Sequence, residues 1–170
     1  MRYQAAKLSD FPDSITRGIP AEWTGIFLHG ETGIGKTHMA AALAKTAMDE
    51  SERGTAHGLI WVSSPELLLT IRATFNGQGN EAQIVQKYST VPTLVIDDFG
   101  AEKITDWSIS SFYLILANRV NWLRKTIVTS NMTLAEIKSW EPRIASRLAG
   151  FDVCLCPGKT DRRLQKSGKL

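Results

Sequence analysis

Five short apolar segments, rich in β-branched residues, recur along the chain and are separated by longer amphipathic stretches. The apolar segments lie at 24–29, 59–63, 93–97, 126–130 and 152–156. Helical patterns occupy 36–53, 64–75, 81–90 and 107–124, and a pair of helices is expected within 133–150. Near-continuous apolar strands are typical of sheets covered on both faces. Strands that alternate with helices indicate βαβ units, so the pattern predicts an α/β domain with a five-stranded parallel sheet flanked by helices.

The first 23 residues do not share this pattern. They are polar and irregular, and Pro12, Gly18 and Pro20 interrupt them. We expect residues 1–23 to form an N-terminal strap and residues 24–170 to form one domain, because 170 residues suffice for a sheet with helices on both faces. No apolar run approaches the ~18 residues of a membrane span, and no signal peptide is visible, so a cytoplasmic protein without membrane contact is expected.

A glycine-rich octapeptide lies between the first apolar segment and the helical pattern that follows it. It reads Gly30-Glu31-Thr32-Gly33-Ile34-Gly35-Lys36-Thr37 and matches the phosphate-binding P-loop, G-x-x-x-x-G-K-[ST]. In this setting the backbone N–H groups of residues 33–37 would point inward and cradle a β-phosphate, aided by the helix dipole. Lys36 would reach the β- and γ-phosphates, and the Thr37 hydroxyl would bind Mg²⁺. The octapeptide therefore predicts a nucleotide-binding site.

Two carboxylates end the third apolar segment, which reads Leu94-Val95-Ile96-Asp97-Asp98-Phe99-Gly100. This is a Walker B arrangement, and the carboxyl ends of parallel strands open beside the P-loop. Asp97 would hold Mg²⁺, directly or through water, and Asp98 would activate the water that attacks the γ-phosphate. Glutamate is the usual second acid in this role. Because aspartate is one methylene shorter, we expect hydrolysis to be slow or to depend on a partner.

Further polar residues follow the fourth apolar segment. Asn131 stands at its tip, where it could orient the attacking water or sense the γ-phosphate, although an asparagine there is also a common turn former. Arg143 and Arg147 are four residues apart and therefore share one helix face, as solvated surface arginines often do. Residues 141–170 hold seven Lys and Arg against three acidic residues, a charge of +4, which suits either an anionic partner or a solvated tail.

These motifs together resemble a known family. The Gly35-Lys36-Thr37-His38 end of the P-loop, the run 95–100, Thr129-Ser130-Asn131 and the run 143–148 resemble, in this order, the AAA+ ATPases of the DnaC/DnaI helicase-loader and IstB transposition-helper group. The resemblance covers nearly the whole chain. It implies nucleotide contacts throughout 30–38, including His38. The chain departs from the family in one respect: it ends soon after Arg163, so we expect the helical lid found in many AAA+ proteins to be minimal or absent.

The resemblance also implies roles for single residues. Asn131 is expected to be sensor 1, and Arg147 is expected to be an arginine finger that completes the site of a neighbouring subunit. Arg162 resembles sensor 2, with Arg163 as the competing choice. The candidates for contact with single-stranded DNA are Arg72, Lys87 and the intervening turn at 76–80.

The family implies a homo-oligomeric ATPase that binds ATP or ADP with Mg²⁺, assembles on single-stranded DNA and acts on a replicative helicase or a transposase. We therefore expect a helicase loader of DNA replication. An IstB-like helper of transposition, with a transposase as partner, is the alternative within the same family. A nucleotide-gated binding module with little hydrolysis is the alternative from another class. A metabolic kinase is disfavoured, because a monomeric kinase has no use for a finger-bearing segment.

Overall fold

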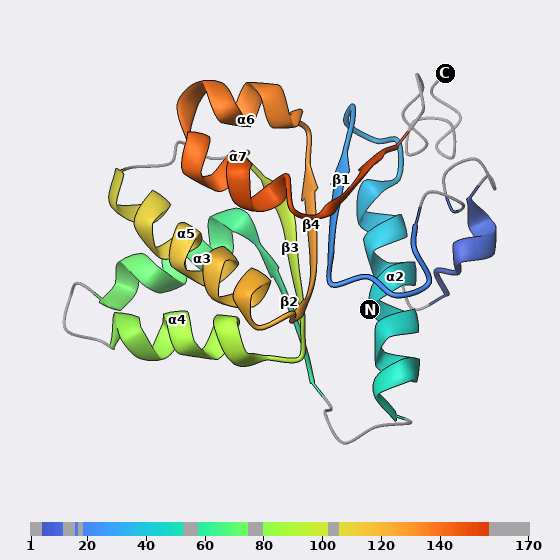
Figure 1. Cartoon of the computed structure of the whole chain (residues 1–170), viewed down its shortest axis with the longest axis horizontal. Helices are drawn as coiled ribbons and strands as arrows, with labels where there is room; N and C mark the ends of the chain where they lie inside the picture. Colours follow the sequence, from blue (N-terminus) through green and yellow to red (C-terminus); the bar gives the residue numbers. More distant parts are fainter. Residues whose placement is uncertain are drawn as a thin grey trace.

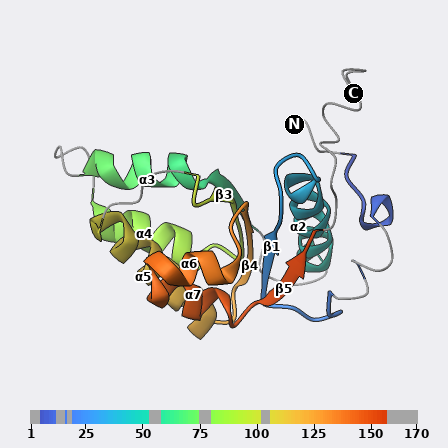
Figure 2. The same cartoon turned by 90° about the horizontal axis from the view of Figure 1, so that it is seen from above.

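The computed structural model describes residues 5–11, 16, 19–52, 58–74, 80–101 and 106–156. These residues form one parallel sheet with a single long helix on one face and a group of helices on the other (Figures 1 and 2). The elements of the described chain are, in order, η1 (Leu8–Asp10), β1 (Gly25–His29), α2 (Lys36–Glu52), β2 (Leu59–Ser63), α3 (Ser64–Ala73), α4 (Glu81–Thr90), β3 (Thr93–Phe99), α5 (Asp106–Asn121), β4 (Lys125–Ser130), α6 (Leu134–Trp140), α7 (Pro142–Leu148) and β5 (Asp152–Leu155).

The five strands are hydrogen-bonded in the order β2-β3-β4-β1-β5, and every neighbouring pair is parallel. This confirms the predicted five-stranded parallel sheet, and the strand positions agree with the sequence pattern to within two residues. Helix α5 ends at Asn121 rather than at 124 as predicted. It ends early because Leu123 adopts a φ of +50°, while the Arg124 N–H donates back to the Arg119 carbonyl and so closes the helix end.

Two apolar cores lie on opposite faces of the sheet. We call them the α2-side core and the α5-side core. The α2-side core contains Ile26, Leu28, Ile34, Met39, Leu43, Val95, Ile127, Cys154 and Cys156, together with Ala6, Phe11 and Trp23 from the N-terminal region. The α5-side core contains Phe27, Leu94, Ile96, Phe99, Phe112, Val128, Ile137, Ile144, Leu148 and their neighbours on α3 to α7. Because helices cover both faces of the sheet, polar and apolar residues do not simply alternate along the strands.

A β-bulge interrupts β3 at the two carboxylates. Ile96 pairs with Val128 but Phe99 pairs with Ser130, so β3 carries one residue more than β4 over this stretch. Asp98 takes up the extra length with a φ of +56° and is exposed. Because of the bulge, Phe99 lies in the α5-side core rather than on the same face as Asp97. The sheet therefore keeps its apolar cover while both acids lie at its carboxyl edge.

The described part of the expected strap lies against the domain. Ala6 and Phe11 are buried in the α2-side core, and η1 contacts α2. Whether residues 1–23 act as a separate unit stays a prediction. The prediction that the C-terminal lid is minimal or absent concerns residues beyond Cys156, which lie outside the described residues. Within the described chain, no helix combines the length and the apolar character needed to cross a bilayer.

Candidate functional site

The glycine-rich loop connects β1 to α2 at the carboxyl edge of the sheet (Figure 1). Gly30 and Gly35 have φ values of +141° and +107°, which residues other than glycine rarely adopt. A Cβ atom on Gly30 would lie 2.9 Å from the Cys156 carbonyl oxygen. Ile34, at the centre of the loop, is 4% exposed and anchors it in the α2-side core. The loop is thus held as a tight turn whose backbone can approach a phosphate closely.

Lys36 is the first residue of α2 and is only 6% exposed. Its ammonium group donates hydrogen bonds to the carbonyl oxygens of Gly30 at 2.8 Å and Glu31 at 2.7 Å. It also donates to Oδ1 of Asn131 at 2.7 Å, which links the P-loop to the tip of β4. A buried ammonium needs such acceptors, and phosphate oxygens can replace them. The structure therefore brings together two of the predicted site residues, Lys36 and Asn131.

The predicted Mg²⁺ ligands also meet. The Thr37 hydroxyl donates to Oδ1 of Asp97 at 3.2 Å, and the Thr129 hydroxyl donates to the same oxygen at 2.6 Å. Burial raises the pKa of Asp97 above its ordinary value, and the hydrogen bonds from Thr129 and Thr37 partly oppose this rise. A hydroxyl oxygen beside a buried carboxylate is the kind of hard donor set that Mg²⁺ prefers. The chemistry of these residues therefore fits Mg²⁺, which Thr37 and Asp97 would hold.

Asp98 differs from its neighbour. Its carboxylate is exposed, and its backbone N–H donates to the Thr129 hydroxyl at 2.9 Å. Thr129 therefore contacts both acids, accepting from the backbone of one and donating to the side chain of the other. The arrangement leaves the Asp98 carboxylate open to solvent at the strand end where a γ-phosphate would lie. Its role as the base that activates water stays a prediction.

His38 lies at the first turn of α2 and contacts the N-terminal region. Its Nε2 atom is 2.9 Å from Oδ2 of Asp10, and its ring lies 5.5 Å from that of Phe11. The hydrogen bond from His38 is the largest cause that lowers the pKa of Asp10. His38 thus connects η1 to the nucleotide loop, and its expected contact with nucleotide stays a prediction.

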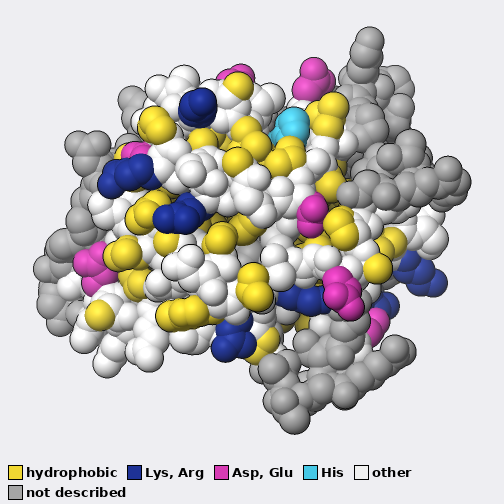
Figure 3. Space-filling model, viewed as in Figure 1, with side chains coloured by type: hydrophobic (Ala, Val, Ile, Leu, Met, Phe, Trp, Pro, Cys, Tyr) yellow, Lys and Arg dark blue, Asp and Glu magenta, His cyan; other side chains and the backbone are white. Residues whose placement is uncertain are grey.

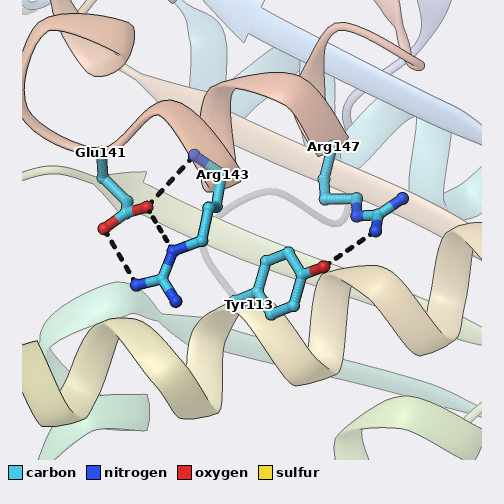
Figure 4. Close-up of polar contacts among 4 residues, drawn as sticks. All are labelled: Tyr113, Glu141, Arg143 and Arg147. Atoms are coloured by element: carbon cyan, nitrogen blue, oxygen red, sulfur yellow. Dashed lines mark hydrogen bonds and ion pairs between the residues drawn. The ribbon is translucent and has the colours of Figure 1, made fainter.

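The arginines of α7 share one face of the helix, as their spacing predicts (Figure 4). Both guanidinium groups approach the ring of Tyr113 on α5, at 5.8 Å for Arg143 and 5.3 Å for Arg147. Helix α7 lies on the sheet face opposite α2, so Arg147 is on the other side of the sheet from the helix that begins at Lys36 (Figure 2).

The remaining candidates are divided between described and undescribed parts of the chain. Arg72, in the last turn of α3, and Lys87, in the last turn of α4, are both exposed, and the two helices contact each other. Arg162, Arg163 and residues 76–79 of the candidate DNA-contacting turn lie outside the described residues. The expectations for these residues stay predictions.

Sequence reasoning missed three residues that the tertiary structure makes important: Tyr113, Arg119 and Thr129. Thr129 was part of the Thr-Ser-Asn run, but its contact with Asp97 depends on β3 and β4 being neighbours. Arg119 is fully buried and donates to the carbonyl oxygens of Tyr88, Val91 and Lys125, which join α4, α5 and the starts of β3 and β4. A charged residue in an amphipathic helix gives no signal of such burial.

The family model described as "IstB-like ATP binding protein" matches residues 21–147 of this chain. The replicative helicase loader DnaI of Bacillus subtilis is 30% identical over 115 residues, which make up 67% of this chain and 35% of DnaI. A Mycobacterium tuberculosis protein described as an ATP-binding protein in an insertion sequence is 27% identical over 106 residues, or 62% of this chain and 40% of that protein. The chain thus spans less than half the length of these relatives.

Solved structures share the fold. The crystal structure of the DnaC helicase loader aligns with a TM-score of 0.71 at 24% identity, over 91% of this chain and 98% of that one. A crystal structure of DnaI aligns with a TM-score of 0.66 at 24% identity, over 88% of this chain and 90% of that one. The replication initiator DnaA bound to AMPPCP and single-stranded DNA gives 0.74 at 17% identity, over 97% and 56%. The predicted P-loop fold of AAA+ type is confirmed.

Proposed function

This chain belongs to the family of IstB-like ATP binding proteins, within the DnaC/DnaI/IstB group of AAA+ ATPases, and on that basis we propose that it hydrolyses ATP and acts as a helicase loader in DNA replication. One observation carries the proposal. Lys36, Asn131, Thr37 and Asp97 come from three separate segments, and hydrogen bonds join them in two pairs, Lys36 to Asn131 and Thr37 to Asp97, at the carboxyl edge of the sheet. This is the arrangement that a triphosphate with Mg²⁺ requires.

ATP binding rests on the loop and on α2. Lys36 exchanges its carbonyl and amide partners for the β- and γ-phosphate oxygens, and the N–H groups at the start of α2 point toward the same phosphates. Thr37 and Asp97 would hold Mg²⁺, and the ion would supply positive charge that offsets the charge of the phosphates. Because Thr37 and Asp97 are already hydrogen-bonded to each other, little reorganisation of the protein is needed for them to share one cation.

Hydrolysis requires an oriented water molecule. Asp98 accepts a proton from this water, and Asn131, once released from Lys36, donates its amide hydrogens to the water or to the γ-phosphate. The exposed position of Asp98 on a bulge favours slow turnover, which a partner accelerates by excluding solvent. Arg147 then supplies positive charge to the γ-phosphate of a neighbouring subunit, so the active form is an oligomer.

The choice of partner rests on the relatives. The similarity to DnaI and to DnaC supports a replicative helicase, and the exposed Arg72 and Lys87 on adjoining helices support contact with the phosphates of single-stranded DNA. An IstB-like helper of transposition is the second candidate, supported by the family model and by the insertion-sequence relative. A binding module that hydrolyses little ATP is favoured only by the short second acid at Asp98.

Single-turnover ATP hydrolysis, measured with and without single-stranded DNA, tests the enzymatic part of the proposal. We expect measurable hydrolysis that DNA stimulates, and hydrolysis in neither condition would favour the binding module. Capture of purified replicative helicase and of purified transposase by the ATP-bound protein tests the biological part. Retention of the transposase alone would replace the loader proposal by the transposition helper.

A further inference from the structure

Among the residues that the structure describes, one neutral side chain holds the guanidinium of Arg147. Its Nη2 atom donates to the Tyr113 hydroxyl at 2.8 Å, and its Cζ atom lies 5.3 Å from the centre of the same ring (Figure 4). Tyr113 lies on α5 and Arg147 on α7, and these helices pack against each other. Tyr113 is itself half-buried against the α5-side core, so its ring provides a fixed support.

Arg143 approaches the same ring but is held differently. Its Nε atom donates to Oε1 of Glu141 at 2.9 Å and its Nη2 atom to Oε2 at 3.4 Å, so the carboxylate binds the guanidinium through both oxygens. Glu141 is 6% exposed and also accepts the Arg143 backbone N–H. The hydrogen bond from Arg143 is the largest cause that lowers the pKa of Glu141. The charge of Arg143 is therefore compensated within its own helix.

The two arginines thus contact the same ring, but a carboxylate compensates the charge of Arg143 and not that of Arg147. Within the described chain, Arg147 forms no ion pair, and the polar partner of its guanidinium is a phenol without charge. A hydrogen bond to a neutral hydroxyl fixes the direction of a guanidinium without cancelling its charge. Arginine side chains otherwise sample many rotamers, and this freedom has to be lost when they bind a phosphate.

From this contrast we propose that Tyr113 is the positioning residue of the arginine finger, holding Arg147 oriented and uncompensated toward the γ-phosphate of a neighbouring subunit. The inference rests on the proposed function, because it presupposes that Arg147 acts in trans. The face that carries α6 and α7 supports it, since Lys and Arg side chains stand there among hydrophobic ones (Figure 3). Tyr113 itself touches no nucleotide and acts only through Arg147.

Mixed oligomers test this inference directly. Lys36→Ala lacks an intact P-loop, and Arg147→Ala lacks the finger. In a mixture, a site is therefore active only where the P-loop of an Arg147→Ala subunit meets the finger of a Lys36→Ala subunit. Tyr113→Phe keeps the ring and removes the hydroxyl. Added to the Lys36→Ala chain, which supplies the finger, it should lower turnover by about three- to tenfold, the scale of one hydrogen bond. Added to the Arg147→Ala chain, which supplies the P-loop, it should change nothing.

Two controls keep the outcome unambiguous. Tyr88→Phe removes a phenol hydroxyl from α4, away from the finger, and should leave turnover of the mixture unchanged when placed in either chain. ATP affinity should be the same with and without Tyr113→Phe, because only the finger is altered. Equal losses from the two placements of Tyr113→Phe, or no loss from either, would overturn the role of Tyr113.

The outcomes also separate this inference from the proposed function. A dead mixture of Lys36→Ala and Arg147→Ala, alongside an active wild-type protein, would overturn the finger in trans and Tyr113 with it, while ATP hydrolysis would stand. A wild-type protein that hydrolyses no ATP, with or without DNA, would overturn the proposed function itself, and a finger would then have no reaction to serve.

Discussion

Replacing Thr129 by valine should destabilise the protein and weaken Mg²⁺-dependent ATP binding, although the side chain keeps its shape. The hydroxyl of Thr129 donates to Asp97 at 2.6 Å and accepts from the Asp98 N–H at 2.9 Å. Losing a hydrogen bond to a charged group costs about 1.5–3 kcal/mol, and leaving a partly buried N–H unpaired adds about 1 kcal/mol. A total of about 3 kcal/mol corresponds to a fall of about 6–12 °C in Tm for a domain of this size.

The same substitution should change how stability depends on pH. Burial raises the pKa of Asp97 in the folded protein, and the Thr129 hydrogen bond is the largest effect that opposes this. Between the ordinary pKa and the raised one, the folded state binds more protons than the unfolded state, so stability falls as pH rises through that window. Thr129→Val raises the pKa of Asp97 further and extends the window upward. The loss of stability should therefore be smaller below the window than at neutral pH.

Urea denaturation of the nucleotide-free protein across pH measures both effects, and calorimetric titration with ATP, with and without Mg²⁺, measures binding. Thr129→Ser is the matched control, because it keeps the hydroxyl and loses only a methyl group, at a cost of about 1 kcal/mol. Valine and serine variants with equal stability and equal Mg²⁺ dependence would refute the reasoning, since the hydroxyl would then contribute nothing.

Other variants address the remaining parts of the structure. Lys36→Ala should lose detectable ATP affinity while circular dichroism shows an intact fold, and ATP should no longer raise its Tm; unchanged affinity would remove the P-loop assignment. Asp98→Asn should bind Mg·ATP but stop turnover, because an amide cannot accept the proton of water, and a wild-type rate would place the base elsewhere. Arg147→Ala should bind ATP normally yet lose about 10³-fold in turnover, and full activity would exclude a finger. Arg119→Met should lose at least about 3 kcal/mol in urea denaturation, because the buried or partly buried carbonyl groups of Tyr88, Val91 and Lys125 lose their donor. Burial lowers the pKa of Arg119 only to about 9, so the side chain is charged at neutral pH. If Arg119→Met were nearly as stable as the wild type, water molecules would have to satisfy the carbonyl groups in place of the guanidinium.

Several features of this protein could be predicted from sequence because they depend on residues close together in the chain. The apolar strands and amphipathic helices follow from local periodicity, and the sheet they form is parallel as predicted. The P-loop requires glycines at fixed positions because its backbone must adopt positive φ angles at Gly30 and Gly35. Acids at the end of a strand must lie at the carboxyl edge of the sheet, so the sequence alone predicts Asp97 beside the loop, where it accepts a hydrogen bond from Thr37.

Only the tertiary structure decided which side chains from distant segments meet. The strand order places β4 between β3 and β1, and this brings Thr129 to Asp97 and Asn131 to Lys36. The bulge between Ile96 and Phe99 arises from pairing with β4 and leaves no mark in the sequence of β3. Arg147 meets Tyr113 because α5 and α7 pack on the same face of the sheet. Such contacts depend on register and packing across the whole fold, whereas a sequence pattern reports only the neighbours of a residue along the chain.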